Sequence, residues 1–255
     1  MALVAFLFGV TGRGGLTGTA LRGLLSDLGL SDDGARALLS RMHRGGQLVA
    51  ERHGRETTYR LTGSLARGFE HIRRRANGEP AVWDGWFHTV LYRVPEVSRP
   101  FRDALRRTAV MSGYGVLQPG VLVAPGDYRD QLADLLAARP EAAQIVFGRL
   151  TVDEADAARV VRTAWRLDEV AADYETHIAR IRRCLSQDPP ASGPPQLRLF
   201  AETLGPALSA TLYEPTVPAE LLPAGWPGPT LRRLLDECSQ RFGSTVSRYV
   251  ASRLD

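Results

Sequence analysis

Basic side chains gather on one side of a short predicted helix near the N-terminus. At about 100° per residue, the apolar residues of segment 35–44 share one face. The opposite face carries Arg36, Ala37, Ser40, Arg41 and Arg44. Guanidinium groups bind guanine edges and phosphates, and small residues allow close approach to a DNA groove. This face therefore predicts a recognition helix, with a solvated basic face as the alternative interpretation.

A second basic group lies at the turn of a predicted β-hairpin. Segments 48–52 and 55–61 alternate in polarity, and Gly54 between them permits the positive φ of a tight turn. A hairpin after a recognition helix is a wing, whose basic tip contacts phosphate or the minor groove. Three residues form this tip: Arg52, His53 and Arg55. For His53 alone, an ordinary exposed turn residue is the alternative.

Three short helices are expected to position these side chains. Apolar residues recur at i, i+3, i+4 and i+7 in segments 3–10, 21–28 and 35–42. Ser31 is the predicted N-cap of the third helix, and Gly29 lies where a tight turn must join it to the second. Two short helices joined by a turn with glycine are typical of a helix-turn-helix.

Glycines between Gly9 and Gly18 suggest a phosphate-binding loop, but their spacing does not fit one. After Gly12 and Gly14, the dinucleotide motif requires a third glycine at position 17, where the sequence has Thr17. No acidic residue ends a second strand about twenty residues further on. A dinucleotide site is therefore not expected here.

The charge of the chain is unevenly distributed. Residues 1–75 contain 12 Arg and 6 acidic residues, a net charge of +6, and residues 76–255 contain 20 Arg and 22 acidic residues, a net of −2. Every basic residue apart from histidine is Arg. A basic N-terminal part on a slightly acidic remainder is typical of a nucleic-acid-binding module joined to another function.

Cellular location is predicted from what the sequence lacks. No run of 18 apolar residues is present, so no membrane interaction is expected. The apolar N-terminus lacks the basic region and cleavage site of a signal peptide. Cys184 and Cys238 show no zinc spacing and are interpreted as buried thiols. We therefore expect a cytoplasmic protein.

The fold class predicted from the whole pattern is α+β. After a linker at residues 76–80, strands and helices alternate as βαββαβ, the order of a ferredoxin-like domain. An apolar seam over residues 167–185 indicates a helix packed on another helix. The predicted domains are a winged helix-turn-helix at 1–75, a ferredoxin-like middle domain at 81–151 and a helical C-terminal domain at 152–255.

Three stretches together resemble one family of regulators. They are residues 35–42 with 59–62; Trp83-Asp84-Gly85-Trp86 with 92–96, 112–115 and 119–121; and residues 218–228. In this order they are similar to the PaaX family, repressors of phenylacetate degradation, over nearly the whole chain. The resemblance implies a dimeric repressor that phenylacetyl-CoA releases from DNA. Leu122 departs from the family's frequent Trp, and Arg93 stands where an acidic residue is common.

An enzyme is the weaker hypothesis. The sequence has no HExxH, GxSxG, P-loop or paired-cysteine motif. The middle segment also resembles the small CRISPR adaptation nuclease, which needs a carboxylate near the end of its first strand to hold a divalent metal. Arg93 occupies that neighbourhood, and a cation repels a metal. We therefore expect no catalysis, no cofactor and no metal.

The predicted function is a sequence-specific repressor of double-stranded DNA. A homodimer would bind an inverted repeat, with bases contacted by Arg36, Ser40 and Arg41 and phosphates by Arg44, Arg52 and Arg55. An acyl-CoA effector would release it. A DNA-binding architectural or partner-recruiting protein without a small-molecule ligand is the alternative. The effector site is not placed. The aromatic candidates for lining a pocket are Trp83, Trp86, Tyr114, Trp165 and Tyr174, but aromatic residues at such spacings are more often part of a core.

Overall fold

The computed structural model describes residues 2–54, 56–63, 66, 83–211 and 217–254 of this α+β protein. Two compact units share the chain, and both are discontinuous in sequence. Unit 1 comprises residues 1–77, 174–212 and 228–255, and unit 2 comprises residues 78–173 and 213–227. The first helices of the chain therefore fold together with its last ones. The division into three domains by sequence stays a prediction.

Unit 1 begins with three short helices, as the apolar spacing predicted. They are α1 (Ala2–Thr11), α2 (Gly18–Asp27) and α3 (Asp32–Arg44). The predicted cap is confirmed, because the Ser31 hydroxyl accepts the Gly34 amide at 3.1 Å. Gly29, with a φ of +94°, makes the turn between α2 and α3.

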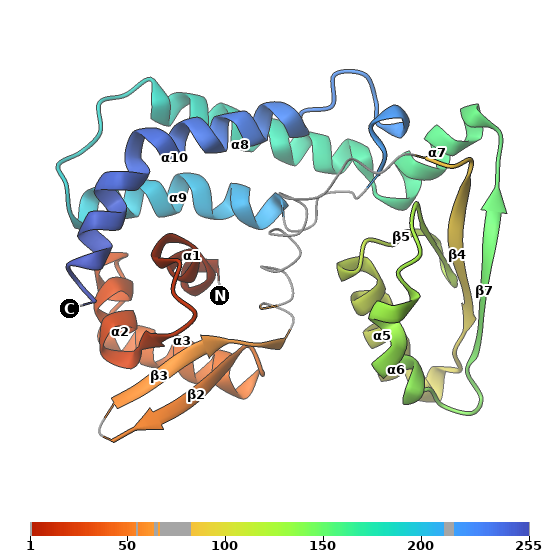
Figure 1. Cartoon of the computed structure of the whole chain (residues 1–255), viewed down its shortest axis with the longest axis horizontal. Coiled ribbons are helices and arrows are strands. Elements are labelled where there is room, and N and C mark those ends of the chain that lie inside the picture. The colour runs from red at the N-terminus through yellow and green to blue at the C-terminus, as the bar shows by residue number, and fades with distance from the viewer. Residues whose placement is uncertain (1, 55, 64–65, 67–82, 212–216, 255) are drawn as a thin grey trace. The chain divides into compact units, whose positions relative to one another are not determined.

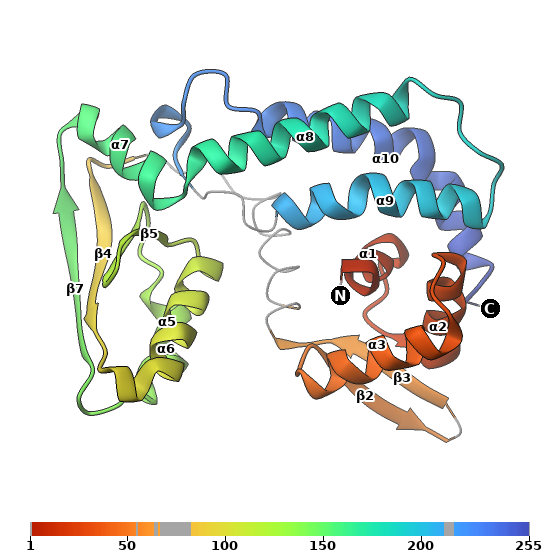
Figure 2. The same cartoon turned by 180° about the vertical axis from the view of Figure 1, so that it is seen from behind.

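The hairpin follows α3 directly. Strand β2 (Leu48–His53) pairs antiparallel with β3 (Glu56–Leu61), and β3 also pairs with β1 (Leu16–Thr17). Gly54 turns the chain at the tip with a φ of +62°, as its position in the sequence predicted. Figures 1 and 2 show α3 beside this hairpin.

Three long helices complete unit 1. They are α8 (Leu167–Leu185), which continues into this unit from unit 2, α9 (Pro194–Thr211) and α10 (Gly228–Ala251). Helix α1 packs against α9 and α10, where the rings of Phe6 and Phe200 meet edge to face at 5.8 Å. The seam predicted in α8 is intramolecular, since Tyr174, Ile178 and Ile181 are all buried.

Unit 2 contains an antiparallel sheet in the order β5-β6-β4-β7. Its strands are β4 (Trp86–Arg93), β5 (Gly115–Gln118), β6 (Val121–Ala124) and β7 (Gln144–Thr151). The helical elements are η1 (Glu96–Ser98), α5 (Arg99–Met111), η2 (Arg129–Leu132), α6 (Ala133–Ala137), α7 (Glu154–Ala164) and η3 (Ala219–Leu221).

Each face of this sheet has its own core. Val90, Leu122 and Leu132 belong to one cluster, and Phe87 and Val161 belong to the other. The alternation of Phe87 and Val90 along β4 places them on opposite faces. Figures 1 and 2 show α5 and α6 together on one side of the strands.

One predicted helix is shorter in the structure than in the sequence pattern. The second helix of the predicted βαββαβ order corresponds to residues 127–138, but a 3-10 turn covers 129–132 and α6 only 133–137. The Asp127 carboxylate accepts the backbone amide of Arg129 at 3.1 Å, which competes with helical hydrogen bonding. The start of this segment is therefore a side-chain-stabilised turn.

Gly115 marks the tightest approach between α7 and the sheet. A Cβ atom there would lie 2.7 Å from the Trp165 ring and 2.8 Å from the Ala164 Cβ. We expect Gly115→Ala to lower the free energy of unfolding by about 1–3 kcal/mol, the usual cost of overpacking. Urea denaturation followed by tryptophan fluorescence measures it. Gly148→Ala in β7 is the control, since no atom lies within 4 Å of its added Cβ; equal midpoints for the two variants would contradict this expectation.

Candidate nucleic-acid interface

Helix α3 has one buried face and one exposed basic face. Ala35, Leu39 and Met42 are at most 2% exposed and anchor the helix to unit 1. On the opposite side the predicted contact residues are all exposed: Arg36, Ser40, Arg41 and Arg44. The apolar stripe thus fixes the helix so that these polar groups face solvent together.

The arginines of this face differ in how they are paired. Arg36 lies 2.6 Å from Asp32, whose carboxylate also lies 3.5 Å from Arg22. Both Arg36 and Asp32 are more than half exposed, so this pair is weak and exchangeable. Within the described ranges, neither Arg41 nor Arg44 has a carboxylate partner. Their guanidinium groups keep all of their donors for an external acceptor.

Two contacts fix the hairpin against the end of α3. The Gln47 amide donates to the Met42 carbonyl at 2.9 Å, and the His43 Nδ1 lies 3.1 Å from the Leu48 carbonyl oxygen. Sequence reasoning did not assign His43 a role. Because it sits on a predicted helix five residues from its acceptor, nothing in the pattern marked it.

The hairpin tip is only partly described. Arg52 is exposed, and its Nε donates to the Gly54 carbonyl at 3.2 Å. The side chain of His53 and the whole of Arg55 lie outside the described residues, so both stay predictions. Along the strands, Arg60 pairs with Glu51 at 3.2 Å, which neutralises one further cation of this sheet.

Asp27, at the end of α2, connects the helix to the C-terminal helices. Its side chain is 13% exposed and accepts the Tyr249 hydroxyl at 2.8 Å and the Arg253 Nε at 3.0 Å. Its carbonyl accepts the Arg198 Nε at 2.5 Å. Burial, with the Asp27 carboxylate nearby, raises the pKa of Tyr249, so the phenol remains a donor. These contacts therefore attach α2 both to α9 and to the C-terminal end of α10.

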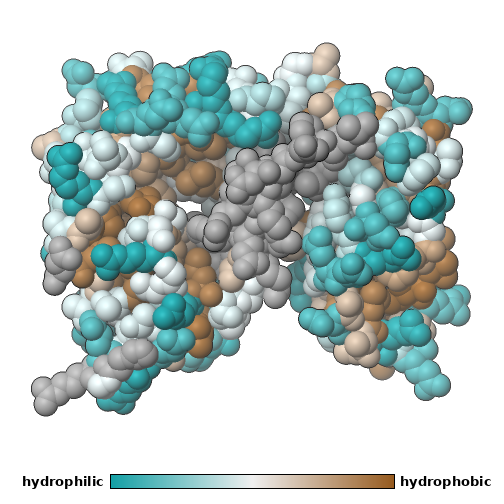
Figure 3. Space-filling model, in the orientation of Figure 1, coloured by the Kyte–Doolittle hydropathy of each residue, from teal (hydrophilic) through white to brown (hydrophobic). Residues whose placement is uncertain are grey.

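An apolar cavity of 590 Å³ lies in the same unit, between α1, α8 and α9. Leu3 and Phe6 line it from α1, and Arg180 and Arg183 are exposed residues of α8 on its border. Figure 3 shows brown, apolar side chains over this part of unit 1. None of the five aromatic residues considered from the sequence lines it, and Tyr174 is a core residue.

Three family models match consecutive parts of the chain. Residues 4–65 match the PaaX-like protein, residues 80–161 the PaaX protein central Cas2-like domain, and residues 165–252 the PaaX-like protein C-terminal domain. Together they cover nearly every residue. The chain belongs to the PaaX family. Residues 36–44, which carry the basic face of α3, fall within the first match.

PaaX relatives are similar over the full length of the chain. The transcriptional repressor PaaX of Escherichia coli (strain K12) is 26% identical over 277 aligned positions, which cover 99% of this chain and 83% of that protein. A solved structure, the uncharacterized protein Rv0674 from Mycobacterium tuberculosis, superposes with a TM-score of 0.59 at 22% identity. The superposed region covers 98% of this chain and 96% of Rv0674, and at this identity the similarity supports the fold alone.

Metal-binding clusters and membrane-spanning helices are both absent from the described part of this PaaX-family chain. No group of three or more His, Cys, Asp or Glu side chains there could hold a metal ion. No helix in the same ranges is long and apolar enough to cross a membrane. The exposed basic face of α3 is the candidate functional surface.

Proposed function

We propose that this PaaX-family chain is a transcriptional repressor that binds double-stranded DNA in a sequence-specific manner. The observation that carries the proposal is the exposed basic face of α3, beside a hairpin that follows it directly. This order of helices and strands supports a winged helix-turn-helix. The E. coli relative is named a transcriptional repressor, which supports the same function and a regulator rather than an enzyme.

The arginines would have two kinds of role. Arg36, Ser40 and Arg41 contact base edges in the major groove, where a bidentate guanidinium selects guanine. Arg44 contacts phosphate near the end of α3, and Arg52 with the predicted Arg55 and His53 does so from the hairpin tip. Arg41 is exposed and has no carboxylate partner among the described residues, so we assign it the largest share in specificity.

The fold of unit 2 supports the ferredoxin-like middle domain predicted for the repressor. In unit 2, the strand order β5-β6-β4-β7 with helices between β4 and β5 and between β6 and β7 is that of a ferredoxin-like domain. A homodimer would present two α3 helices to half-sites of an inverted repeat, about 34–36 Å or a multiple apart. A DNA-binding role would have the protein act in the cytoplasm.

The effector would be an acyl-CoA, with phenylacetyl-CoA as the first candidate from the family resemblance. The cavity of 590 Å³ has the size of a small-molecule site, an apolar wall for an acyl group, and Arg180 and Arg183 to meet phosphate. Because Leu3 and Phe6 line the cavity from α1, and α1 packs on α2, a ligand there acts on the helices that carry α3. Release requires tighter binding to the DNA-incompetent state.

Fluorescence anisotropy with the gene's own upstream DNA tests this function. We expect tight binding that weakens steeply with salt, and release by phenylacetyl-CoA but not by free CoA. Absence of DNA binding at low salt would contradict the proposal that the protein is a repressor. If phenylacetyl-CoA changed neither DNA binding nor the melting temperature of the protein, the alternative would be supported, a DNA-binding protein without a small-molecule ligand.

A further inference from the structure

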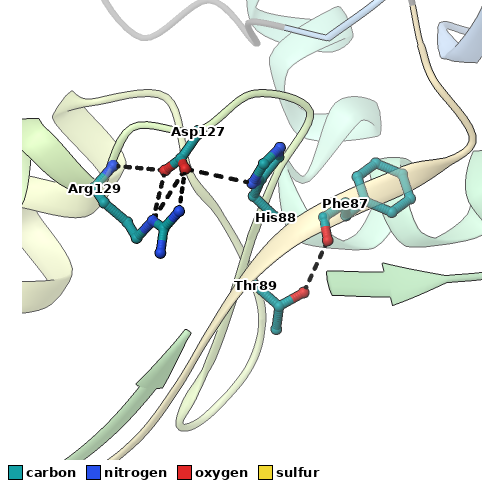
Figure 4. A network of polar contacts seen from close by, with 5 residues as sticks. All are labelled: Phe87, His88, Thr89, Asp127 and Arg129. Atoms are coloured by element: carbon teal, nitrogen blue, oxygen red, sulfur yellow. Dashed lines mark hydrogen bonds and ion pairs between the residues drawn. The ribbon is translucent and has the colours of Figure 1, made fainter. Parts of the chain in front are cut away.

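A second, smaller cavity lies in unit 2 and is lined mainly by polar groups. It has a volume of 160 Å³ and opens beside strands β4 and β7 and the loop after β6. The residues that matter for its chemistry are His88, Tyr114, Asp127, Arg129, Phe147 and Arg149. Figure 4 shows the Asp127 carboxylate between the side chains of Arg129 and His88.

The Asp127 carboxylate forms an ion pair with Arg129. It accepts the Arg129 Nε at 3.0 Å and the Nη2 at 2.5 Å, and its Oδ2 lies 4.0 Å from the His88 Nδ1. The hydrogen bonds from Arg129 lower the pKa of Asp127 to about 2, so the carboxylate is charged near neutral pH. One carboxylate therefore balances one guanidinium, and the pair holds Arg129 in place.

Arg149 supplies a positive charge that nothing in the described ranges balances. Its guanidinium carbon lies 4.5 Å from the centre of the Trp86 ring, and it has no carboxylate partner among those residues. Stacking on Trp86 fixes the guanidinium while its N–H donors stay available. Because the charges of Arg129 and Asp127 cancel, Arg149 gives the lining of the cavity a net positive charge.

Tyr114 adds a buried donor without an acceptor. The residue is 1% exposed, and its hydroxyl proton has no acceptor within the part of the chain that the structure describes. Burial raises the pKa of Tyr114 to about 12, so the oxygen keeps its proton. A buried hydroxyl proton without an acceptor is costly and is rare in folded proteins. An oxygen atom of a ligand in this cavity would supply the missing acceptor.

We propose that this cavity binds a small organic carboxylate, held by Arg149, by the Arg129 Nη1 that Asp127 does not use, and by the Tyr114 hydroxyl. The carboxylate matches a lining of donors with a net positive charge. Phe147, whose ring lies 5.6 Å from the Arg129 guanidinium carbon, offers an apolar wall for the body of the ligand. A cavity of about 150 Å³ holds a benzene-sized molecule, which is far smaller than an acyl-CoA. The site is therefore distinct from the cavity assigned to the effector and does not depend on DNA binding.

Isothermal titration of the full chain with benzoate, acetate and inorganic phosphate, at matched ionic strength, tests the site. We expect benzoate to bind saturably, acetate more weakly because it leaves the Phe147 wall uncovered, and phosphate most weakly. Arg149→Gln should weaken benzoate binding by about tenfold or more, as expected for a charged hydrogen bond. Arg106→Gln, an exposed arginine of α5 outside the cavity, removes the same charge and should leave the affinity unchanged.

Tyr114→Phe provides a second variant that keeps the ring and removes only the hydroxyl. It should weaken benzoate binding about fivefold to tenfold while the ligand-free protein melts at the same or a higher temperature, because the hydroxyl proton without an acceptor is gone. Absence of saturable benzoate binding, preference for phosphate, or equal losses in the Arg106 and Arg149 variants would overturn the proposal. Binding to operator DNA, measured in parallel, reports separately on the repressor function.

Discussion

Replacing Arg41 by alanine is expected to abolish most of the preference for the operator over unrelated DNA. The side chain is exposed on α3 and has no carboxylate partner in the described ranges, so its donors are available to a base. A bidentate contact to guanine is worth about 1–3 kcal/mol of discrimination, or roughly 5-fold to 150-fold in affinity. Anisotropy titrations with the operator and with a scrambled duplex of equal length measure the ratio.

Two controls separate this role from a general effect of charge. Arg44→Ala should weaken binding to both duplexes alike. It should also reduce the slope of log affinity against log salt concentration by about one, as expected when one phosphate contact is lost. Arg248→Ala removes an exposed cation of α10 in the same unit and should change neither. If Arg41→Ala weakened both duplexes equally, Arg41 would hold phosphate and the assignment of base contacts to it would be wrong.

Replacing Asp27 by alanine is expected to destabilise unit 1 and to reduce DNA affinity at the same time. The substitution leaves the Tyr249 hydroxyl and the Arg253 guanidinium without their acceptor. Hydrogen bonds to a charged group contribute about 1.5–3 kcal/mol each, and the exposure of Arg253 places the expected loss at about 2 kcal/mol. Since α2 packs on α3, a loosened α2 also displaces the basic face. Urea denaturation and anisotropy on the operator measure the two effects.

A double-mutant cycle gives the sharpest form of this test. Tyr249→Phe removes only the hydroxyl that donates to Asp27 and should cost about 1 kcal/mol. If both residues act through one hydrogen bond, the double variant with Asp27→Ala should be little worse than Asp27→Ala alone. Strictly additive losses would show that Asp27 stabilises the unit in another way.

The sequence predicted the features that have a local physical cause. The buried face of α3 follows from apolar residues every three or four positions, its cap from the Ser31 hydroxyl, and the hairpin turn from Gly54. These interactions join residues that are close along the chain. The elements of unit 2 were found for the same reason, apart from residues 127–132, where the Asp127 side chain competes with the helix.

The sequence did not predict the features that depend on distant residues. The partners of Asp27 lie 171 to 226 positions away, and each is an ordinary tyrosine or arginine of α9, of α10 or of the turn after α10. The two cavities likewise combine side chains from separate elements, so no spacing in the chain marks them. Tyr114 shows the same limit. The sequence suggested either a core or a pocket residue, but the missing acceptor for its hydroxyl is visible only in three dimensions.

The discontinuity of unit 1 has a consequence for protein synthesis. Helices α1, α2 and α3 emerge from the ribosome early. However, α1 and α2 pack against α9 and α10, and Asp27 of α2 binds Arg253, which lies 226 positions later in the chain. Domains whose segments are contiguous fold as they emerge, whereas these helices must wait for the last part of the chain. We therefore expect a prematurely terminated polypeptide to lack the packing that supports α1, α2 and, through them, α3. Under the proposed function, only finished molecules would compete for the operator.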